Sequence, residues 1–237
     1  MTVVRSRGTW PDAVALRRGW ALAHARPWNR DVPDAALRLV RGSSAFLEAC
    51  AHHLVDLGVS GVASPPVLDS GRGVWERAGF GSHLRLDLYR CQLPRGDDRP
   101  PHPVVEATEP SWQRAAEIDR AAFEPPWRLE ELGLREAFGS TTHRVFLVVG
   151  SNGRVDGFAI VGAELGAAYL QRVAVDPEAQ GRGLGKSLVR EAQRWANRHG
   201  AHSMLLNTQP ENQRAAALYR AEGFRLLPDR LEVLRRS

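Results

Sequence analysis

The stretch Gln180–Ser187, QGRGLGKS, places three glycines within five residues, directly before Lys186 and Ser187. Glycine lowers helix stability, so a local need for a bare backbone would explain its repeated use here. The stretch follows an apolar run and precedes a helical pattern. Free N–H groups and the positive dipole end make a helix N-terminus an anion site. We therefore expect a phosphate-binding loop, with a tight turn that binds nothing as the alternative.

Two common phosphate motifs do not fit this stretch. A nucleoside-triphosphate P-loop requires glycine at the position of Gln180. A dinucleotide fingerprint requires glycine at Lys186 or at Leu188, depending on the glycine from which it starts. The spacing present is instead Gln-x-x-Gly-x-Gly, from Gln180 to Gly185.

The chain beyond Pro103 reads as alternating strands and helices, in the order β-α-α-β-β-β-α-β-α-β-β. Such an order predicts an α/β fold with a mixed sheet and helices on its faces. The predicted strands are Val104–Ala107, Arg144–Val149, Val155–Glu164, Tyr169–Val175, Ser203–Thr208, and a last hairpin of Phe224–Leu227 with Leu231–Leu234 around Pro228-Asp229. The predicted helices run from Pro110 to about Phe123, over Arg128–Phe138, from Lys186 to Gly200, and from Asn212 to Gly223.

In this context the glycine spacing resembles that of the GNAT superfamily of acetyl-coenzyme A-dependent N-acetyltransferases. Leu170–Val189, LQRVAVDPEAQGRGLGKSLV, is similar to the family's fourth strand, pyrophosphate loop and third helix. Glu211–Phe224, ENQRAAALYRAEGF, is similar to its fourth helix. The resemblance covers roughly Val104 to Arg236 and implies a GNAT-like fold with acetyl-coenzyme A as cosubstrate and no metal.

The resemblance also implies a coenzyme site. Backbone groups of the strand before the loop would pair with the pantetheine arm as an added strand, and loop N–H groups would hold the pyrophosphate. Arg182 and Lys186 are expected to add phosphate contacts. Asn212 would contact the pantetheine or simply cap its helix. The expected coenzyme-binding residues are Val173, Ala174, Val175, Gln180, Gly181, Arg182, Gly183, Leu184, Gly185, Lys186, Asn212 and Tyr219.

Tyr219 matches the family tyrosine that protonates the departing thiolate, with a core aromatic as the alternative role. An N–H of the strand Tyr169–Val175, that of Val173, is expected to polarise the thioester carbonyl. The general base is open. Asn207 stands where related ribosomal-protein alanine acetyltransferases have a glutamate, and an amide there can only order a water. Glu164 and Tyr169 are the other candidates, and Glu164 is also consistent with a solvated surface position.

The acceptor side is expected in Ala121–Leu132, AAFEPPWRLEEL, because the family's first two helices line that site. Phe123 and Trp127 are candidates for the walls of a slot, and Glu124 for attraction of a cationic amine. A proline-broken helix pair anchored by a tryptophan is the alternative. A peptide N-terminus, a small amine, an aminoglycoside-like amine and a lysine side chain all remain open as acceptors.

The N-terminal part carries a faint echo of the C-terminal one. Val74–Phe80, VWERAGF, is similar to Leu218–Phe224, LYRAEGF, and puts Trp75 at the position of Tyr219. The counterpart of the glycine loop, near Arg38–Ser43, lacks the glycine spacing. We expect a degenerate GNAT-like or packing domain over 1–93, a linker over 94–103 and a catalytic domain over 104–237, with no catalysis in the first. Chance similarity of one helix end is the alternative.

Composition limits the other function classes. The net charge is +5 and the pI is about 10.0, yet the arginines are spread along the chain among acids, so a nucleic-acid partner is not favoured. No apolar run spans a bilayer, and two cysteines cannot form a disulfide framework, so a cytoplasmic protein is expected. Cys50, His52 and His53 do not converge as metal ligands. A non-catalytic acyl-coenzyme A-binding or regulatory module, and a mycothiol-synthase-like enzyme, are the alternatives.

Overall fold

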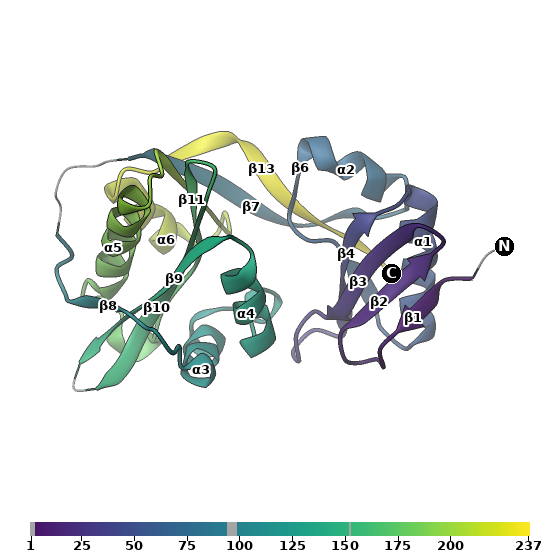
Figure 1. Cartoon of the computed structure of the whole chain (residues 1–237), viewed down its shortest axis with the longest axis horizontal. Helices are drawn as coiled ribbons and strands as arrows, with labels where there is room; N and C mark the ends of the chain where they lie inside the picture. Colours follow the sequence, from purple (N-terminus) through teal and green to yellow (C-terminus); the bar gives the residue numbers. More distant parts are fainter. Residues whose placement is uncertain (1–2, 94–98, 152) are drawn as a thin grey trace. The chain divides into compact units, whose positions relative to one another are not determined.

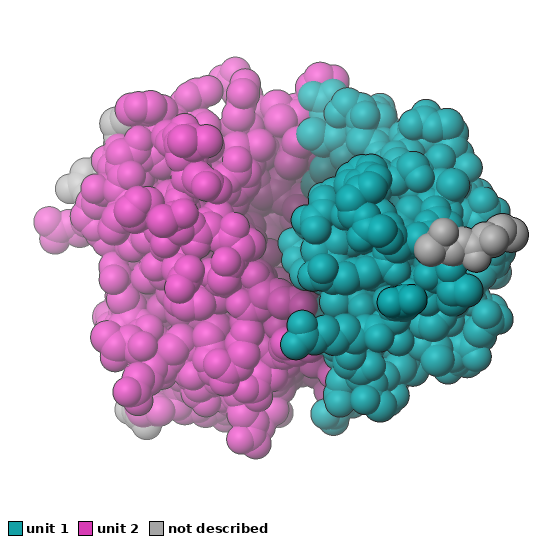
Figure 2. Space-filling view, turned by 45° about the vertical axis from the view of Figure 1, so that its right-hand side comes forward, with its two compact units in different colours: residues 1–86, 229–237 teal, residues 87–228 magenta. Residues whose placement is uncertain are grey.

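The computed structural model describes residues 3–93, 99–151 and 153–237. The chain divides into two compact units, residues 1–86 with 229–237 and residues 87–228 (Figure 2). Part of the expected linker, residues 94–98, lies outside the described residues. The units thus divide the chain at other places than the expected boundaries at 93 and 104. Residues 229–237 belong to the first unit, and residues 87–93 belong to the second.

The second unit is a mixed sheet with the strand order β7-β12-β11-β10-β9-β8 (Figure 1). All neighbouring pairs are antiparallel except β11 and β12, which run parallel and are connected through a helix. The strands are β7 (Gly81–Gln92, from Asp87 in this unit), β8 (Val104–Glu106), β9 (His143–Ser151), β10 (Arg154–Glu164), β11 (Ala167–Val175) and β12 (Ser203–Thr208).

Helices cover both faces of this sheet. The apolar stripe of α5 (Leu184–Arg198), with Leu188, Ala192 and Trp195, joins α6 (Gln213–Ala221) on one face. Helices α3 (Trp112–Ala122) and α4 (Glu131–Gly139), with the 3-10 turn η1 (Pro125–Trp127), close the other face over Phe146, Phe158 and Ile160. A second 3-10 turn, η2 (Pro177–Ala179), connects β11 to the glycine loop.

The first unit repeats the pattern with fewer parts. Its strand order is β1-β2-β3-β4-β5-β13-β7, and β4 and β5 are parallel across α1, as β11 and β12 are across α5. Its elements are β1 (Arg5–Arg7), β2 (Val14–Arg18), β3 (Ala21–Pro27), β4 (Asp34–Arg41), α1 (Ser44–Asp56), β5 (Gly61–Ala63), β6 (Val67–Leu68) and α2 (Asp69–Glu76). The matching order makes this unit a smaller, degenerate version of the second.

Two strands, β7 and β13 (Arg225–Arg236), each run from one unit into the other. Asp87–Gln92 of β7 pair with β12 in the second unit, and Arg235 and Arg236 of β13 pair with β5 in the first. The predicted C-terminal hairpin is therefore wrong, because β13 is one continuous strand through Pro228-Asp229. Turn residues predict a reversal only locally, and pairing with β5, β6 and β7 keeps this segment extended.

Two helix boundaries also differ from expectation. Helix α5 begins at Leu184 rather than at Lys186, because Gly183 takes the N-cap position. The helix predicted from Arg128 begins at Glu131, because Arg128 has extended backbone angles and the Leu129 N–H bonds to the Asp119 carboxylate. None of the described helices has both the length and the apolar character needed to cross a membrane.

Candidate coenzyme and acceptor site

The glycine loop adopts a backbone that only glycine takes readily. Gly181 and Gly183 have φ angles of +82° and +85°, in the left-handed region. A Cβ built on Gly185 would lie 3.4 Å from a methyl group of Leu218, so this glycine permits close packing of α5 on α6. No side chain caps α5, which leaves the N–H groups of its first turn without a capping acceptor. The sequence Gln180–Lys186 therefore forms an uncapped helix start, the kind of site at which an anion can be held.

Hydrogen bonds to three other segments fix this loop. The Gln180 side chain donates to the Val175 carbonyl oxygen at 3.0 Å and accepts from Arg214 in the first turn of α6. The His102 ring Nε2 donates to the Arg182 carbonyl oxygen at 2.7 Å, and the His102 backbone N–H donates to the Ser187 hydroxyl at 3.0 Å. The loop is thus held from strand β11, from α6 and from the segment before β8.

Strand β11 offers an open edge next to the loop. It pairs with β12 only from Ala167 to Tyr169, so the two strands separate beyond that point. The Asp176 N–H bonds to the Asp156 carbonyl oxygen of β10, at 2.8 Å. Because backbone groups alternate in an antiparallel pair, those of Val173 and Val175 point away from β10, toward the opening. This edge can accept an extended polar chain as an additional strand.

Tyr219 lies in α6 with 5% of its surface exposed, between the rings of Tyr89 at 6.3 Å and Phe224 at 5.9 Å. Burial raises the pKa of its phenol to about 12, partly offset by the positive charge of Arg172. The phenol is therefore protonated at neutral pH, as a proton donor must be. The same burial makes Tyr219 a member of the core, so both expected roles are compatible with its position.

The expected acceptor segment is fastened to β11 by a buried ion pair. The Arg172 guanidinium makes two bonds to Asp119, at 2.6 and 2.8 Å, and one to the Trp127 carbonyl oxygen, at 2.7 Å. Its central carbon lies 3.5 Å from the centroid of the Phe123 ring. Phe123 and Trp127 are thus brought to the strand residue beside Val173. Glu124 lies in the same segment and is exposed.

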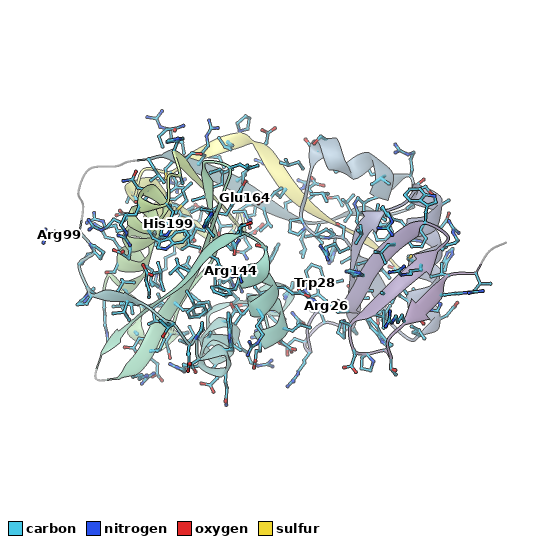
Figure 3. All side chains as sticks on the ribbon, viewed as in Figure 1. Arg26, Trp28, Arg99, Arg144, Glu164 and His199 are labelled. Carbon is cyan, nitrogen blue, oxygen red and sulfur yellow. The ribbon has the colours of Figure 1, made fainter. Side chains whose placement is uncertain are left out.

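The candidate bases are separated by the fold. Asn207 lies in β12, two residues beyond its last pairing with β11, so it borders the opening between the strands, and its side chain is exposed. Glu164, labelled in Figure 3, ends β10 and pairs with Ala167 at the opposite end of β11. Six residues of strand separate Ala167 from Val173, about 20 Å. Of the two, only Asn207 lies beside the open edge.

The remaining predicted residues have partners of their own. The Lys186 ammonium lies 3.7 Å from the buried Glu222 carboxylate, which Arg190 also binds at 2.9 Å. Arg182 donates to the Glu178 carbonyl oxygen at 3.3 Å. The Asn212 side chain accepts from the Ala215 N–H at 3.0 Å, which confirms it as the N-cap of α6. Ala174 and Leu184 are buried core residues, and the backbone groups of Ala174 face β10 rather than the open edge.

The first unit has no comparable site at the matching place. Trp75 is buried and packs edge-on against Phe80, as Tyr219 packs against Phe224. At the start of α1 the Phe46 ring lies 2.7 Å from where a Cβ of Gly42 would stand, so an apolar side chain occupies that helix start. Cys50 is buried, and burial raises the pKa of its thiol to about 12. Groups of three metal-ligating side chains are absent from the described part of the chain.

Sequence reasoning missed three groups at this site: His102, Tyr89 and the Asp119–Arg172 pair. His102 and Tyr89 stand in or before the expected linker, where no local pattern connects them with the loop or with Tyr219. Burial of Asp119 could have been predicted, because it lies on the apolar stripe of α3 beside Ala115 and Ile118. A buried carboxylate predicts a buried cation, although it does not identify which one.

Comparison with known proteins supplies the family context. Residues 112–224 match the model described as the acetyltransferase (GNAT) family. Mycothiol acetyltransferase of Acidimicrobium ferrooxidans is 28% identical over 204 residues, which cover 78% of this chain and 64% of that protein. The chain therefore matches less than two thirds of the length of that relative. The ribosomal protein bS18-alanine N-acetyltransferase of Escherichia coli is 30% identical over 112 residues, 46% of this chain and 72% of that protein.

A solved structure extends the likeness to both units. The tandem GNAT protein from the clavulanic acid biosynthesis pathway matches with a TM-score of 0.64 over 94% of this chain and 82% of that one. At 16% identity this likeness concerns the fold alone. It agrees with the repeated strand order of the two units, and confirms the expected GNAT-like fold with a degenerate N-terminal half.

Proposed function

Because the chain belongs to the GNAT acetyltransferase family, we propose that its second unit transfers an acetyl group from acetyl-coenzyme A to a primary amine. The observation that carries this proposal is the open edge of β11 leading into the uncapped start of α5. The edge suits an extended amide chain and the helix start suits a diphosphate. Coenzyme A contains both groups, as its pantetheine arm and its pyrophosphate.

Each part of the site has a role in this proposal. The coenzyme supplies an acetyl group activated as a thioester. The Val173 N–H, on the open edge, polarises the acetyl carbonyl and stabilises the charge that develops on its oxygen. Tyr219 donates its phenolic proton to the sulfur as the C–S bond breaks and the C–N bond forms. Its raised pKa keeps that proton available.

The acceptor amine must lose a proton during attack. Asn207 orders a water beside the open edge, and that water accepts the proton. Phe123 and Trp127 form walls of the acceptor slot, and exposed Glu124 attracts the cationic amine before it binds. A peptide N-terminus and a small amine are the acceptors that we propose to test first, the former because a relative's name specifies a ribosomal protein alanine.

The first unit does not take part in this chemistry in our proposal. It has a tryptophan at the position of Tyr219 and a phenylalanine ring at its helix start. It also lacks the two helices that carry the acceptor segment, since only Gly8–Ala13 connect β1 to β2 among the described elements.

The test is calorimetry of acetyl-coenzyme A binding to the wild type and to Gly183→Glu, followed by thiol release with a panel of amines and peptides. We expect wild-type binding and its loss in the variant, because a carboxylate would stand in the anion site. Glu178→Gln, an exposed change just before the loop, is the control and should leave binding unaltered.

Thiol release then separates the enzyme from its rival. An acyl-coenzyme A-binding module without catalysis would bind the coenzyme and release no thiol with any acceptor. Absence of wild-type binding would contradict the coenzyme site itself.

A further inference from the structure

One face of the sheet in the first unit has no helix on it. Strands β8 to β11 of the second unit are covered on both faces, and α3 and α4 lie between β8 and β9 in the sequence. Their counterparts β1 and β2 are joined by Gly8–Ala13 alone. Helix α1 lies behind β2–β4 in Figure 1, and the core of the unit lies on that side. Of the two helices that the structure describes in this unit, α1 and α2, neither packs on the opposite face, because the buried residues of both belong to that core.

This uncovered face is basic. Its exposed side chains are Arg5, Arg7, Arg17, His24, Arg38 and Arg41, and we call it the arginine face. The strand registers align them in two rows across the sheet. Arg5 lies opposite Arg17, which lies opposite Leu22, which lies opposite Arg41. In the second row Arg7 lies opposite Ala15, then His24 and Arg38 follow.

The spacing of the rows follows from strand geometry. Two residues along a strand separate the rows by about 7 Å, and three strand spacings make the face about 14 Å wide from β1 to β4. Like charges this close repel one another, which destabilises the sheet unless an anion binds. The face therefore presents an ordered array of positive charge.

The residues that the structure describes do not neutralise the exposed arginines of this face. No ion pair involves Arg5, Arg7, Arg17, Arg38 or Arg41 among the residues that the structure describes. Arg38 instead donates to His24 Nδ1 at 3.1 Å, and Arg41 to the Trp20 carbonyl oxygen at 2.6 Å. Asp34 is the one acid among the described positions of this face, and Arg235 binds it at 2.6 and 2.9 Å.

An aromatic side chain stands at the rim. Trp20 is 69% exposed in the turn between β2 and β3, and the bond from Arg41 ties its backbone to the arginine face. An exposed indole is a stacking platform for a nucleobase. A sheet surface with basic side chains and exposed aromatics is one of the ways in which proteins bind single-stranded nucleic acid.

We propose that the arginine face binds the phosphate backbone of single-stranded nucleic acid, with Trp20 stacking on a base. Arginine is also common in interfaces between proteins, but there it surrounds an apolar or aromatic core, whereas the exposed side chains named for this face are five arginines and one histidine. Interfaces with nucleic acid are polar and strongly positive, which matches it better than an acidic protein does. The sequence did not favour such a partner, because these arginines are scattered among acidic residues along the chain. In the folded unit the arginines lie together on one face of the sheet, apart from those acids.

The test measures fluorescence anisotropy of a labelled single strand of about 12 nucleotides, as RNA and as DNA, with the full chain. Salt is varied between about 50 and 300 mM. The variant Arg5→Gln/Arg17→Gln removes two neighbouring charges. Arg77→Gln/Arg225→Gln removes the same charge from exposed positions outside the arginine face and is the matched control. Thermal denaturation checks that every variant is folded.

We expect the wild type to bind, and the first variant to bind at least about tenfold more weakly at low salt. Its plot of log affinity against log salt should be shallower by about 1.4, for two lost phosphate contacts. The control should stay within about twofold, and Trp20→Ala should weaken binding about fivefold or more. Tighter binding of RNA than of DNA would identify RNA as the natural ligand. Equal binding of the two would support the proposal for both kinds of single strand.

Three results would overturn the proposal. The first is that the wild type binds neither strand at low salt. The second is that the control variant loses as much affinity as the arginine-face variant. The third is that a polyglutamate peptide displaces the nucleic acid as well as unlabelled RNA does, which would assign the face to acidic proteins.

Discussion

The guanidinium of Arg172 and the fully buried carboxylate of Asp119 form a two-point ion pair, at 2.6 and 2.8 Å, between the centre of β11 and helix α3. The same guanidinium holds the Trp127 carbonyl oxygen and covers the Phe123 ring. One side chain thus connects the strand of the proposed coenzyme site with the segment proposed to receive the acceptor. A change at either residue should therefore affect both stability and acceptor binding.

Asp119→Asn should destabilise the second unit by about 3 kcal/mol, because it leaves a buried guanidinium without its counter-charge. The control is Glu131→Gln, which breaks the exposed pair of Glu131 with Arg135, 49% and 52% exposed, and should cost less than about 1 kcal/mol. Urea denaturation followed by tryptophan fluorescence measures both. Equal losses in the two variants would show that the buried pair has no special role.

Tyr219→Phe should lower kcat about 100-fold while the coenzyme dissociation constant stays within about twofold. The ring and its packing remain, and only the proton donor is removed. Burial raises the pKa of this phenol to about 12, so the proton-donating form persists as pH rises past about 10, where an ordinary tyrosine ionises. The wild-type rate should show no loss from this group between about pH 8 and 10. A wild-type rate equal to that of the Phe variant would remove Tyr219 from the mechanism.

Gly183→Ala should weaken coenzyme binding and cost about 1–2 kcal/mol of stability, because its φ of +85° is unfavourable for a residue with a Cβ. The Cβ itself would meet only ordinary contact, 3.6 Å from the His102 ring, so the cost is one of backbone strain. Gly139→Ala is the matched control, since Gly139 ends α4 with open space around it. It should leave binding unchanged and keep or slightly raise the melting temperature.

Leu234→Ala should destabilise the first unit by about 2–5 kcal/mol, although Leu234 stands near the end of the sequence. The residue is 0% exposed in the core of that unit, where its N–H bonds to the Ser64 hydroxyl. Leu226→Ala, in the same strand but 50% exposed, should cost less than about 0.5 kcal/mol. Hydrogen exchange should report the difference as faster exchange in β4 and β5. Slow exchange there in the Leu234 variant would contradict the role of β13 in this unit.

The sequence by itself determined the features that are local. The glycines of Gln180–Gly185 permit the left-handed backbone that Gly181 and Gly183 adopt, and the periodic apolar residues after Lys186 predicted a helix with one buried face. Asn212 was identified as an N-cap from the residues around it. Such features depend on dihedral angles and on the periodicity of neighbouring residues, which a single stretch contains in full.

Only the tertiary structure decided which distant residues meet. Asp119 and Arg172 are 53 positions apart, and Tyr89 reaches Tyr219 from before the expected linker. The last strand was predicted as a hairpin because its turn residues can be read from the sequence, whereas its pairing with β5, β6 and β7 cannot. The arginine face arises in the same way, since strand register gathers cations that the sequence scatters. Long-range pairing is selected by the burial and charge of whole surfaces, and no local pattern encodes it.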